Sequence, residues 1–336
     1  MRHPLLTVVL LGALPPAGFA QTATGDAVAT TTHFAFYSDL PTNVHDTLIT
    51  VATARRANRP DIFDAVEQAC FNGLPAAERE AWDRAVDDYV AARSTRGQRV
   101  YERFVLAGFL RPESVADTGD RDFLRRWTAL LQAPAPAYRR CRWPAQDASN
   151  RRWIGQARTL LATYERPLGE RLPQLFTSPW TGLPFRVDIV NVGSFSGADS
   201  AHGGEPDTPH ILISSANPSN QGFAALEAAF HEASHFLTGP DSPLDTALRT
   251  ATARTGASVP PDLLHQVHFF ITGEAVRRVL ADHGEMYTPH LFALKLFSDR
   301  FREIIARVWL PQINGTRTLD EAAVELVRGL NTQSDK

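Results

Sequence analysis

The segment from residue 223 to 237, FAALEAAFHEASHFL, constrains this chain most, because two of its histidines lie four residues apart with a glutamate between them. In an α-helix, positions i and i+4 lie about 40° apart on one face. His231 and His235 can therefore reach the same ion, with Glu232 beside it. Apolar residues recur at helical spacing around this motif, which predicts a helix that is buried along one side.

A histidine pair at this spacing is typical of a zinc site that carries its own base. Two neutral imidazoles bind Zn²⁺ without quenching its charge, and a third protein ligand fixes the geometry. The fourth position holds a water whose pKa falls towards about 7. Glu232 can accept the proton of that water and deliver it to a leaving amine. The competing interpretation is an amphipathic helix with two incidental histidines.

The motif His231-Glu232-Ala233-Ser234-His235 resembles that of the zincin metallopeptidases. The resemblance covers residues 185–285, in which the segments 185–192 and 210–214 are predicted strands ahead of the metal helix. It implies a small sheet beside that helix, with an edge strand that binds an extended peptide. We therefore expect an α+β fold that is mostly α-helical and contains a zincin-like catalytic region.

Glu274 is the first candidate for the third metal ligand. The pattern over residues 262–282 predicts a long helix, and Glu274 falls within its apolar stripe. A carboxylate buried there needs a cation or strong hydrogen bonds. Zinc is one such cation, and the arrangement resembles gluzincins, whose third ligand is a glutamate on a helix after HExxH. The structural alternative is a pair with Arg277 or Arg278.

Asp241 is the rival candidate. It lies six residues after His235, where metzincin-like and aspartate-using zincins carry their third ligand. Those families have a glycine three residues after the second histidine, whereas this chain has Thr238 there. The sequence therefore favours Glu274 over Asp241.

Two more histidines lie on the same predicted helix as Glu274. His268 borders the apolar stripe, while His265 lies about 180° from Glu274 around the helix. A histidine in this region can stabilise the oxyanion of a tetrahedral intermediate, as a His or Tyr does in many gluzincins. His268 is the first candidate for this catalytic role and His265 the second. A hydrogen-bonded structural histidine is the alternative for both.

The N-terminus has the pattern of a cleavable secretory signal. Residues 1–20 begin with basic residues, continue through an apolar run that is too short to span a bilayer, and end in small residues. We expect cleavage near Ala20 and a secreted or periplasmic mature chain without membrane insertion. In such a compartment Cys70 and Cys141, the two cysteines of the chain, are predicted to form a disulfide.

Length and charge limit the remaining possibilities. The net charge of −3 does not indicate nucleic-acid binding, which usually requires a basic surface. The 336 residues suffice for one large domain or two lobes. We predict a mainly helical N-terminal lobe over 21–166 and a zincin-like metal-binding lobe over 167–336. A glycine-rich loop over 193–209, which contains His202, is predicted to border the active site.

These patterns predict an exported zinc metallopeptidase with a peptide or protein substrate. In this prediction His231, His235 and Glu274 bind Zn²⁺. Two alternatives stay open, namely a non-catalytic zinc-bearing binding module and a zinc hydrolase of a non-peptide amide. In structural zinc sites a Cys or His usually occupies the fourth coordination position. The two cysteines of this chain lack CxxC spacing, which favours a catalytic site over a structural one. Substrate specificity is set by pockets that no motif marks.

Overall fold

The computed structural model describes residues 26–60, 62–91, 128–191, 198–201 and 210–331, together with Asp122 and Arg125. Two sequence predictions lie outside the described residues, the signal segment 1–20 and His202, as does most of the predicted loop over 193–209.

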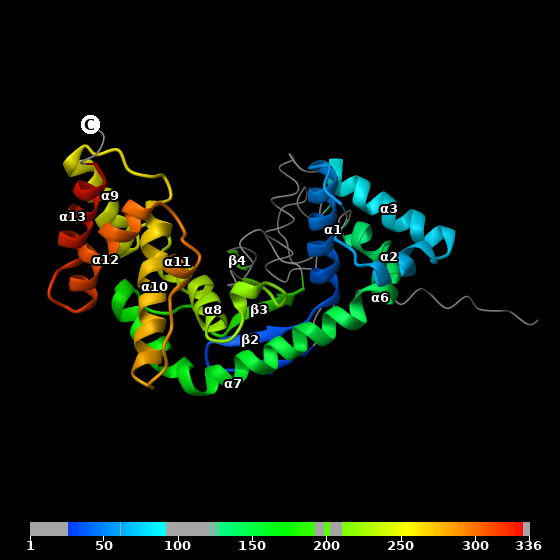
Figure 1. Ribbon diagram of the computed structural model, residues 1–336, viewed down its shortest axis with the longest axis horizontal. Coiled ribbons are helices and arrows are strands. Elements are labelled where there is room, and N and C mark those ends of the chain that lie inside the picture. The colour runs from blue at the N-terminus through cyan, green and yellow to red at the C-terminus, as the bar shows by residue number, and fades with distance from the viewer. Residues whose placement is uncertain are drawn as a thin grey trace, which may run out of the picture.

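One five-stranded sheet lies at the centre of a mostly helical chain (Figure 1). Its strands are β1 (Ala29–Thr30), β2 (Phe34–Tyr37), β3 (Phe185–Val190), β4 (Ala198–Ala201) and β5 (His210–Ser214). Their order across the sheet is β1-β2-β3-β5-β4. Strands β2, β3 and β5 are parallel, while β1 and β4 pair antiparallel at the two edges. The predicted α+β, mostly helical class is confirmed.

The central strands bury one apolar face. Val187 lies opposite Ile211 and Ile189 lies opposite Ile213 in the parallel register, and all four side chains are fully buried. β-Branched residues fit this pleated surface well, since their side chains pack against cross-strand neighbours. The same core cluster includes residues of α7 and α8, so these two helices pack on the sheet.

Helices make up most of the remaining structure. Before β3 come α1 (Leu40–Arg56), α2 (Ala65–Asn72), α3 (Ala76–Ala91), α6 (Ala135–Cys141) and α7 (Trp143–Phe176). After β5 come η4 (Pro218–Asn220), α8 (Ala224–Ser234), η5 (His235–Leu237), α9 (Pro243–Thr255), α10 (Leu263–Ala281), α11 (His290–Ala293), α12 (Asp299–Ile313) and α13 (Leu319–Asn331). Side-chain caps explain several starts; for example, Asp39 accepts a hydrogen bond from the Thr42 N–H at the start of α1.

α7 runs without a break through Pro167 and Pro173, where the sequence predicts a turn and a lobe boundary. A proline inside a helix removes a backbone donor and costs about 3 kcal/mol or more. Leu168, Leu172 and Phe176 are fully buried in the large core, and each such burial contributes about 1.5–3 kcal/mol. Packing therefore offsets the cost of the prolines. The predicted boundary between residues 166 and 167 falls inside a continuous helix.

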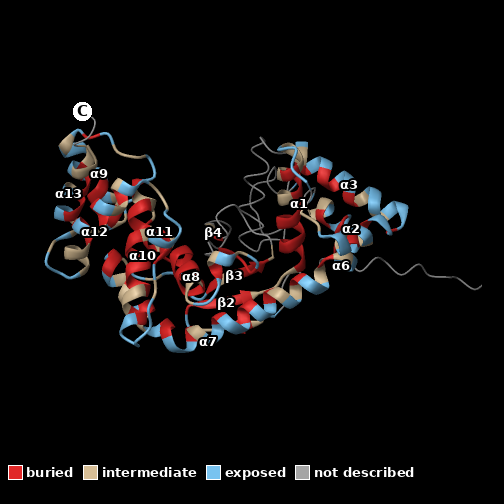
Figure 2. Cartoon of the chain, in the orientation of Figure 1, coloured by how far each residue is buried: buried red, intermediate tan, exposed pale blue. Residues whose placement is uncertain are grey.

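Buried apolar side chains form two clusters. Buried residues are marked in red along α1, α8 and α10 in Figure 2. The smaller cluster draws on α1, α2, α3 and α6, whereas the larger one combines β1 and β2 with the chain from α7 onwards. The predicted disulfide is confirmed. It joins Cys70 of α2 to Cys141 at the end of α6, with the Cα atoms 5.5 Å apart.

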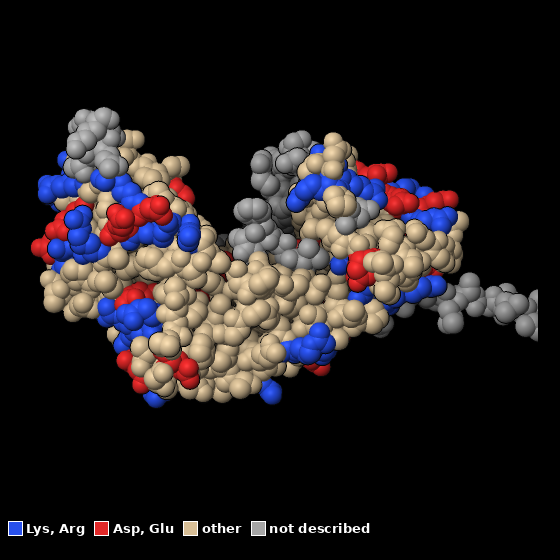
Figure 3. All heavy atoms as spheres, viewed as in Figure 1, with Lys and Arg blue, Asp and Glu red and all other residues tan. Residues whose placement is uncertain are grey.

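The molecular surface is hollowed between the end formed by α1–α3 and the end formed by α9–α13 (Figure 3). Charged side chains gather over these two ends, and β4 and α8 lie in the middle of the molecule (Figure 1). Within the part of the chain that the structure describes, no helix is long and apolar enough to cross a membrane.

Candidate metal centre

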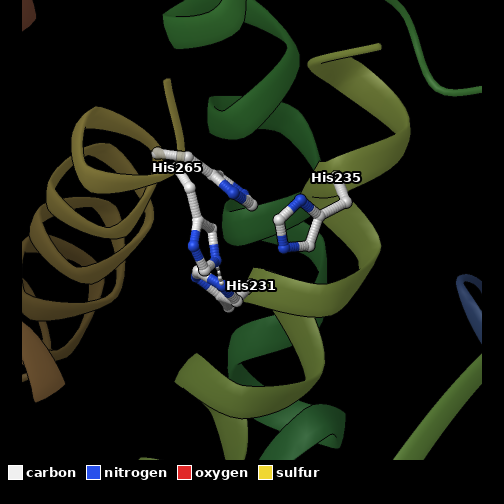
Figure 4. A group of neighbouring side chains, drawn as sticks. His231, His235 and His265 are labelled. Carbon is white, nitrogen blue, oxygen red and sulfur yellow. Dashed lines mark hydrogen bonds between the residues drawn. The ribbon is translucent and has the colours of Figure 1, made fainter. Parts of the chain in front are cut away.

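α8 carries the first half of the site and is buried in the middle of the molecule. Phe230 and Ala233 are fully buried in the large core, and the helix contacts β4, β5 and α10. The α-helix ends at Ser234, and His235 begins the short helix η5. His231 and His235 nevertheless project together, with ring centroids 5.0 Å apart (Figure 4).

Glu227, one turn before His231, anchors α8 to the chain that follows α10. Its buried carboxylate accepts hydrogen bonds from the Tyr287 hydroxyl at 2.7 Å and from the backbone N–H of His290 at 3.0 Å. Gly273 on α10 permits this close approach, because a Cβ at that position would lie 3.0 Å from a Glu227 carboxylate oxygen. These contacts fix the position of α8 against α10.

α10 supplies the second half of the site. His265 and His268 lie three residues apart near its start, so they project from neighbouring positions on the helix surface. The ligand-capable atoms of His231, His235, His265 and His268 all lie within 4.8 Å of one another. Four histidines from α8, η5 and α10 could therefore hold a metal ion.

Three of these rings have the spacing of a metal tripod. The ring centroids are 5.0 Å apart for His231 and His235, 5.4 Å for His231 and His265, and 5.1 Å for His235 and His265. For imidazoles on one tetrahedral ion, a Zn–N distance of about 2.05 Å puts the centroids about 5.2 Å apart and the nitrogens about 3.3 Å apart. The Nε2 atoms of His231 and His265 are 3.3 Å apart (Figure 4). The spacing of these three rings is therefore compatible with imidazoles on one metal ion.

His268 does not share this spacing. Its ring stacks on that of His231 at 4.3 Å and lies 4.2 Å from that of His235, but 6.1 Å from that of His265. The side chain is fully buried, whereas His265 is partly exposed. A side chain with no exposed surface is a poor donor to a substrate oxyanion, so the structure does not support the catalytic role predicted for His268. His265, by contrast, has the ring spacing expected of a metal ligand.

The electrostatic environment favours neutral imidazoles. Burial lowers the pKa of His231 and of His268 well below the ordinary value, and neighbouring histidines lower it further. Burial also lowers the pKa of His265, with partial opposition from Asp262. A histidine must be neutral to bind a metal, so these side chains are in the ligand form at neutral pH.

Glu274 does not lie in the histidine cluster. Its carboxylate accepts hydrogen bonds from Arg277 at 2.7 Å and from Arg278 at 2.6 Å. Burial raises the pKa of Glu274, but these two arginines outweigh that effect and lower it overall. Nine residues separate Glu274 from His265, which is about 13.5 Å along α10 and half a turn around it. The inference that this carboxylate needs a cation was sound, but arginine supplies the charge.

Asp241 does not lie in the cluster either. Its side chain is 86% exposed and accepts a hydrogen bond from Arg249 at 2.8 Å. The residue has a positive φ of 65°, in the turn between η5 and α9. Both carboxylates predicted as third ligand are thus engaged with arginines outside the four-histidine group.

Glu232 lies with the histidines in a cleft of about 590 Å³. Its carboxylate Oε2 is 4.0 Å from the Nε2 of His235, and its side chain is 9% exposed. Ala198 and Ser200 of β4 line one part of the cleft. Another part is lined by Thr238, Gly239, Pro240, Pro261, Asp262, Leu264 and Phe269. The cleft therefore brings a carboxylate, a histidine cluster and an edge strand together.

The sequence prediction missed His265 as a candidate ligand and β4 as an element. A signal for His265 exists, because a pair of histidines three residues apart on a predicted helix can serve one ion as well as the HExxH pair does. β4 is a four-residue strand, ADSA, inside a segment rich in glycine and polar residues, so strand propensity gives it no signal.

Comparisons of this chain with protein-family models, with curated proteins and with solved structures gave no match.

Proposed function

We propose that this protein is a zinc metallopeptidase in which His231, His235 and His265 hold the metal and Glu232 is the general base. The observation that carries this proposal is the similar spacing of the three rings, whose centroids are 5.0, 5.4 and 5.1 Å apart, with Glu232 in the same cleft. A bound zinc would polarise a substrate carbonyl and lower the pKa of a water towards about 7.

The three proposed ligands are all neutral, which affects the chemistry. A carboxylate ligand would cancel part of the charge of the ion, whereas three imidazoles leave it at +2. Glu232 is then the anionic group of the motif, and it is positioned to accept a proton and to deliver it to the leaving amine. The partial burial of Glu232 strengthens its interactions with charge in the cleft.

A peptide is the substrate class that the surroundings of the site favour. β4 is an edge of the described sheet, and its residues Ala198 and Ser200 line the cleft. This is the position in which the zincin resemblance expects the strand along which an extended peptide lies. A peptide in that position would present a carbonyl group to the histidine cluster.

We further propose that the chain works outside the cytoplasm, as the N-terminal pattern predicts. The disulfide Cys70–Cys141 supports this proposal, because such bonds persist in oxidising compartments and are rare in the cytosol.

The main alternative is a non-catalytic zinc module in which His268 fills the fourth position. The distances of 4.2, 4.3 and 6.1 Å from the His268 ring to the other three depart from tetrahedral spacing, which argues against this alternative.

The test is incubation of the zinc-loaded protein with a broad peptide library, with cleavage products read by mass spectrometry. We expect about one zinc per chain and hydrolysis that stops with a chelator and returns with added zinc. Hydrolysis that is indifferent to the chelator would overturn the proposal. Full zinc occupancy without cleavage of any peptide would favour the non-catalytic module.

A further inference from the structure

Three fully buried side chains form a hydrogen-bonded chain between α8 and α10, next to the histidine tripod. The Ser234 hydroxyl is at its centre, 2.5 Å from the Nε2 of His268 and 2.9 Å from the Oγ1 of Thr272. Ser234 immediately precedes His235 in the HExxH motif, while His268 and Thr272 lie one turn apart on α10. We name this group, Ser234, His268 and Thr272, the buried clamp.

The Ser234 hydroxyl has three hydrogen-bond partners. Besides His268 and Thr272, the backbone carbonyl of His231 lies 3.0 Å from its Oγ. A hydroxyl has one hydrogen and two lone pairs, so it can engage all three partners at once. The other ring nitrogen of His268, Nδ1, is buried and has no hydrogen-bond partner among the described residues. The hydroxyl of Ser234 therefore joins groups from both helices.

The His268 ring also supports the tripod by direct contact. Its ring centroid lies 4.3 Å from that of His231 and 4.2 Å from that of His235. The ring of Phe176 from α7 packs edge-on against it, with the centroids 5.4 Å apart. It is therefore held by α7, α8 and α10 at once. A ring in this place limits how far the two ligands of the HExxH motif can shift relative to α10.

We infer that His268 is a positioning residue, which sets the offset between α8 and α10 through its hydrogen bond to Ser234. This inference rests on the proposed metal site, in which the ligands come from two sides. α8 and η5 carry His231 and His235, whereas α10 carries His265. The Glu227 contacts hold α8 one turn before His231, whereas the buried clamp acts at the turns that carry the ligands. Without the buried clamp, the third ligand is held less tightly in register with the other two. Loss of an outer-shell partner of this kind typically weakens metal affinity roughly 10- to 100-fold.

The test compares zinc affinities measured by competition with a chromophoric chelator. We expect Ser234→Ala and His268→Phe to weaken zinc binding roughly 10- to 100-fold. Thr272→Val should weaken it as well, whereas Thr272→Ser, which keeps the hydroxyl, should retain the wild-type affinity. The control is Val276→Ala on α10, a fully buried side chain one turn beyond Thr272. It should lower the melting temperature of the metal-free protein and leave the zinc affinity unchanged.

The outcomes that would contradict the inference can be told apart. Unchanged zinc affinity in both Ser234→Ala and His268→Phe would refute the positioning role and leave the proposed function intact. A loss in His268→Phe as large as that in His265→Ala, with one fewer nitrogen ligand in X-ray absorption spectra, would make His268 a ligand. A wild-type protein that binds no zinc would refute the proposed function itself, and the inference with it.

Discussion

Replacement of Glu232 by glutamine should separate catalysis from metal binding. Glutamine has the same shape and fits the same buried position, where the carboxylate lies 4.0 Å from the Nε2 of His235. The three proposed ligands are untouched, so zinc affinity should stay within a few-fold of wild type. A glutamine cannot accept the proton, and general-base catalysis contributes roughly 10²- to 10⁴-fold. That loss corresponds to about 2.7–5.5 kcal/mol in the activation free energy.

The assay is kcat for a peptide found in the library screen, measured at saturating zinc beside a zinc titration of the same preparation. Glu285→Gln is the matched control. This glutamate is exposed, follows α10 in the chain and does not line the cleft. It should retain both activity and zinc. The reasoning about Glu232 would be refuted by a Glu232→Gln variant that keeps zinc and cleaves peptides at more than a tenth of the wild-type rate.

Two further predictions concern stability. Glu274→Gln should lower the free energy of unfolding by about 1–2 kcal/mol at pH 7, because two partly exposed arginines lose a charged partner. The pKa of Glu274 is lowered from 4.5, so this contribution is present above that pH and is lost on acidification. Urea unfolding at pH 7 and pH 3 should show the difference between wild type and variant shrink, and a constant difference would contradict it. Replacing Cys70 and Cys141 by serine should cost about 2–5 kcal/mol, given their sequence separation of 71 residues; unchanged urea midpoints would show otherwise.

The helix that carries the HExxH motif could be predicted from the sequence because its signal is local. The apolar spacing around His231 and His235 is the consequence of burial on one side, and the structure has α8 and η5 where the pattern predicts a helix. The strand HILIS matches β5 at both ends for the same reason, since a short apolar run between turn residues has few alternatives.

The third ligand could not be selected by the same reasoning. The sequence indicates that the buried carboxylate of Glu274 needs a cation. A metal ion and the nearby arginines can both meet that need, and helical spacing alone does not show which of them does. The choice depends on how α10 lies across α8, which is set by distant contacts such as Glu227 with Tyr287. His265 becomes a ligand candidate only once that crossing is known.

α7 gives the same lesson for the fold. Pro167 and Pro173 carry the strongest local signal against a helix, yet the helix continues because its buried face packs on the sheet and on α10. Tertiary packing outweighs the local preference there. The disulfide, in contrast, follows from the predicted export together with the cysteine count, since Cys70 and Cys141 are the two cysteines of the chain.

The central claim is that His265, and not a carboxylate, completes the metal site with His231 and His235. The most direct measurement is the zinc affinity of His265→Ala beside that of Glu274→Ala, with both proteins shown to be folded by circular dichroism. We predict that His265→Ala loses more than the roughly 10- to 100-fold typical of an outer-shell partner, while Glu274→Ala binds zinc as the wild type does. Wild-type zinc affinity in His265→Ala together with a large loss in Glu274→Ala would contradict the account.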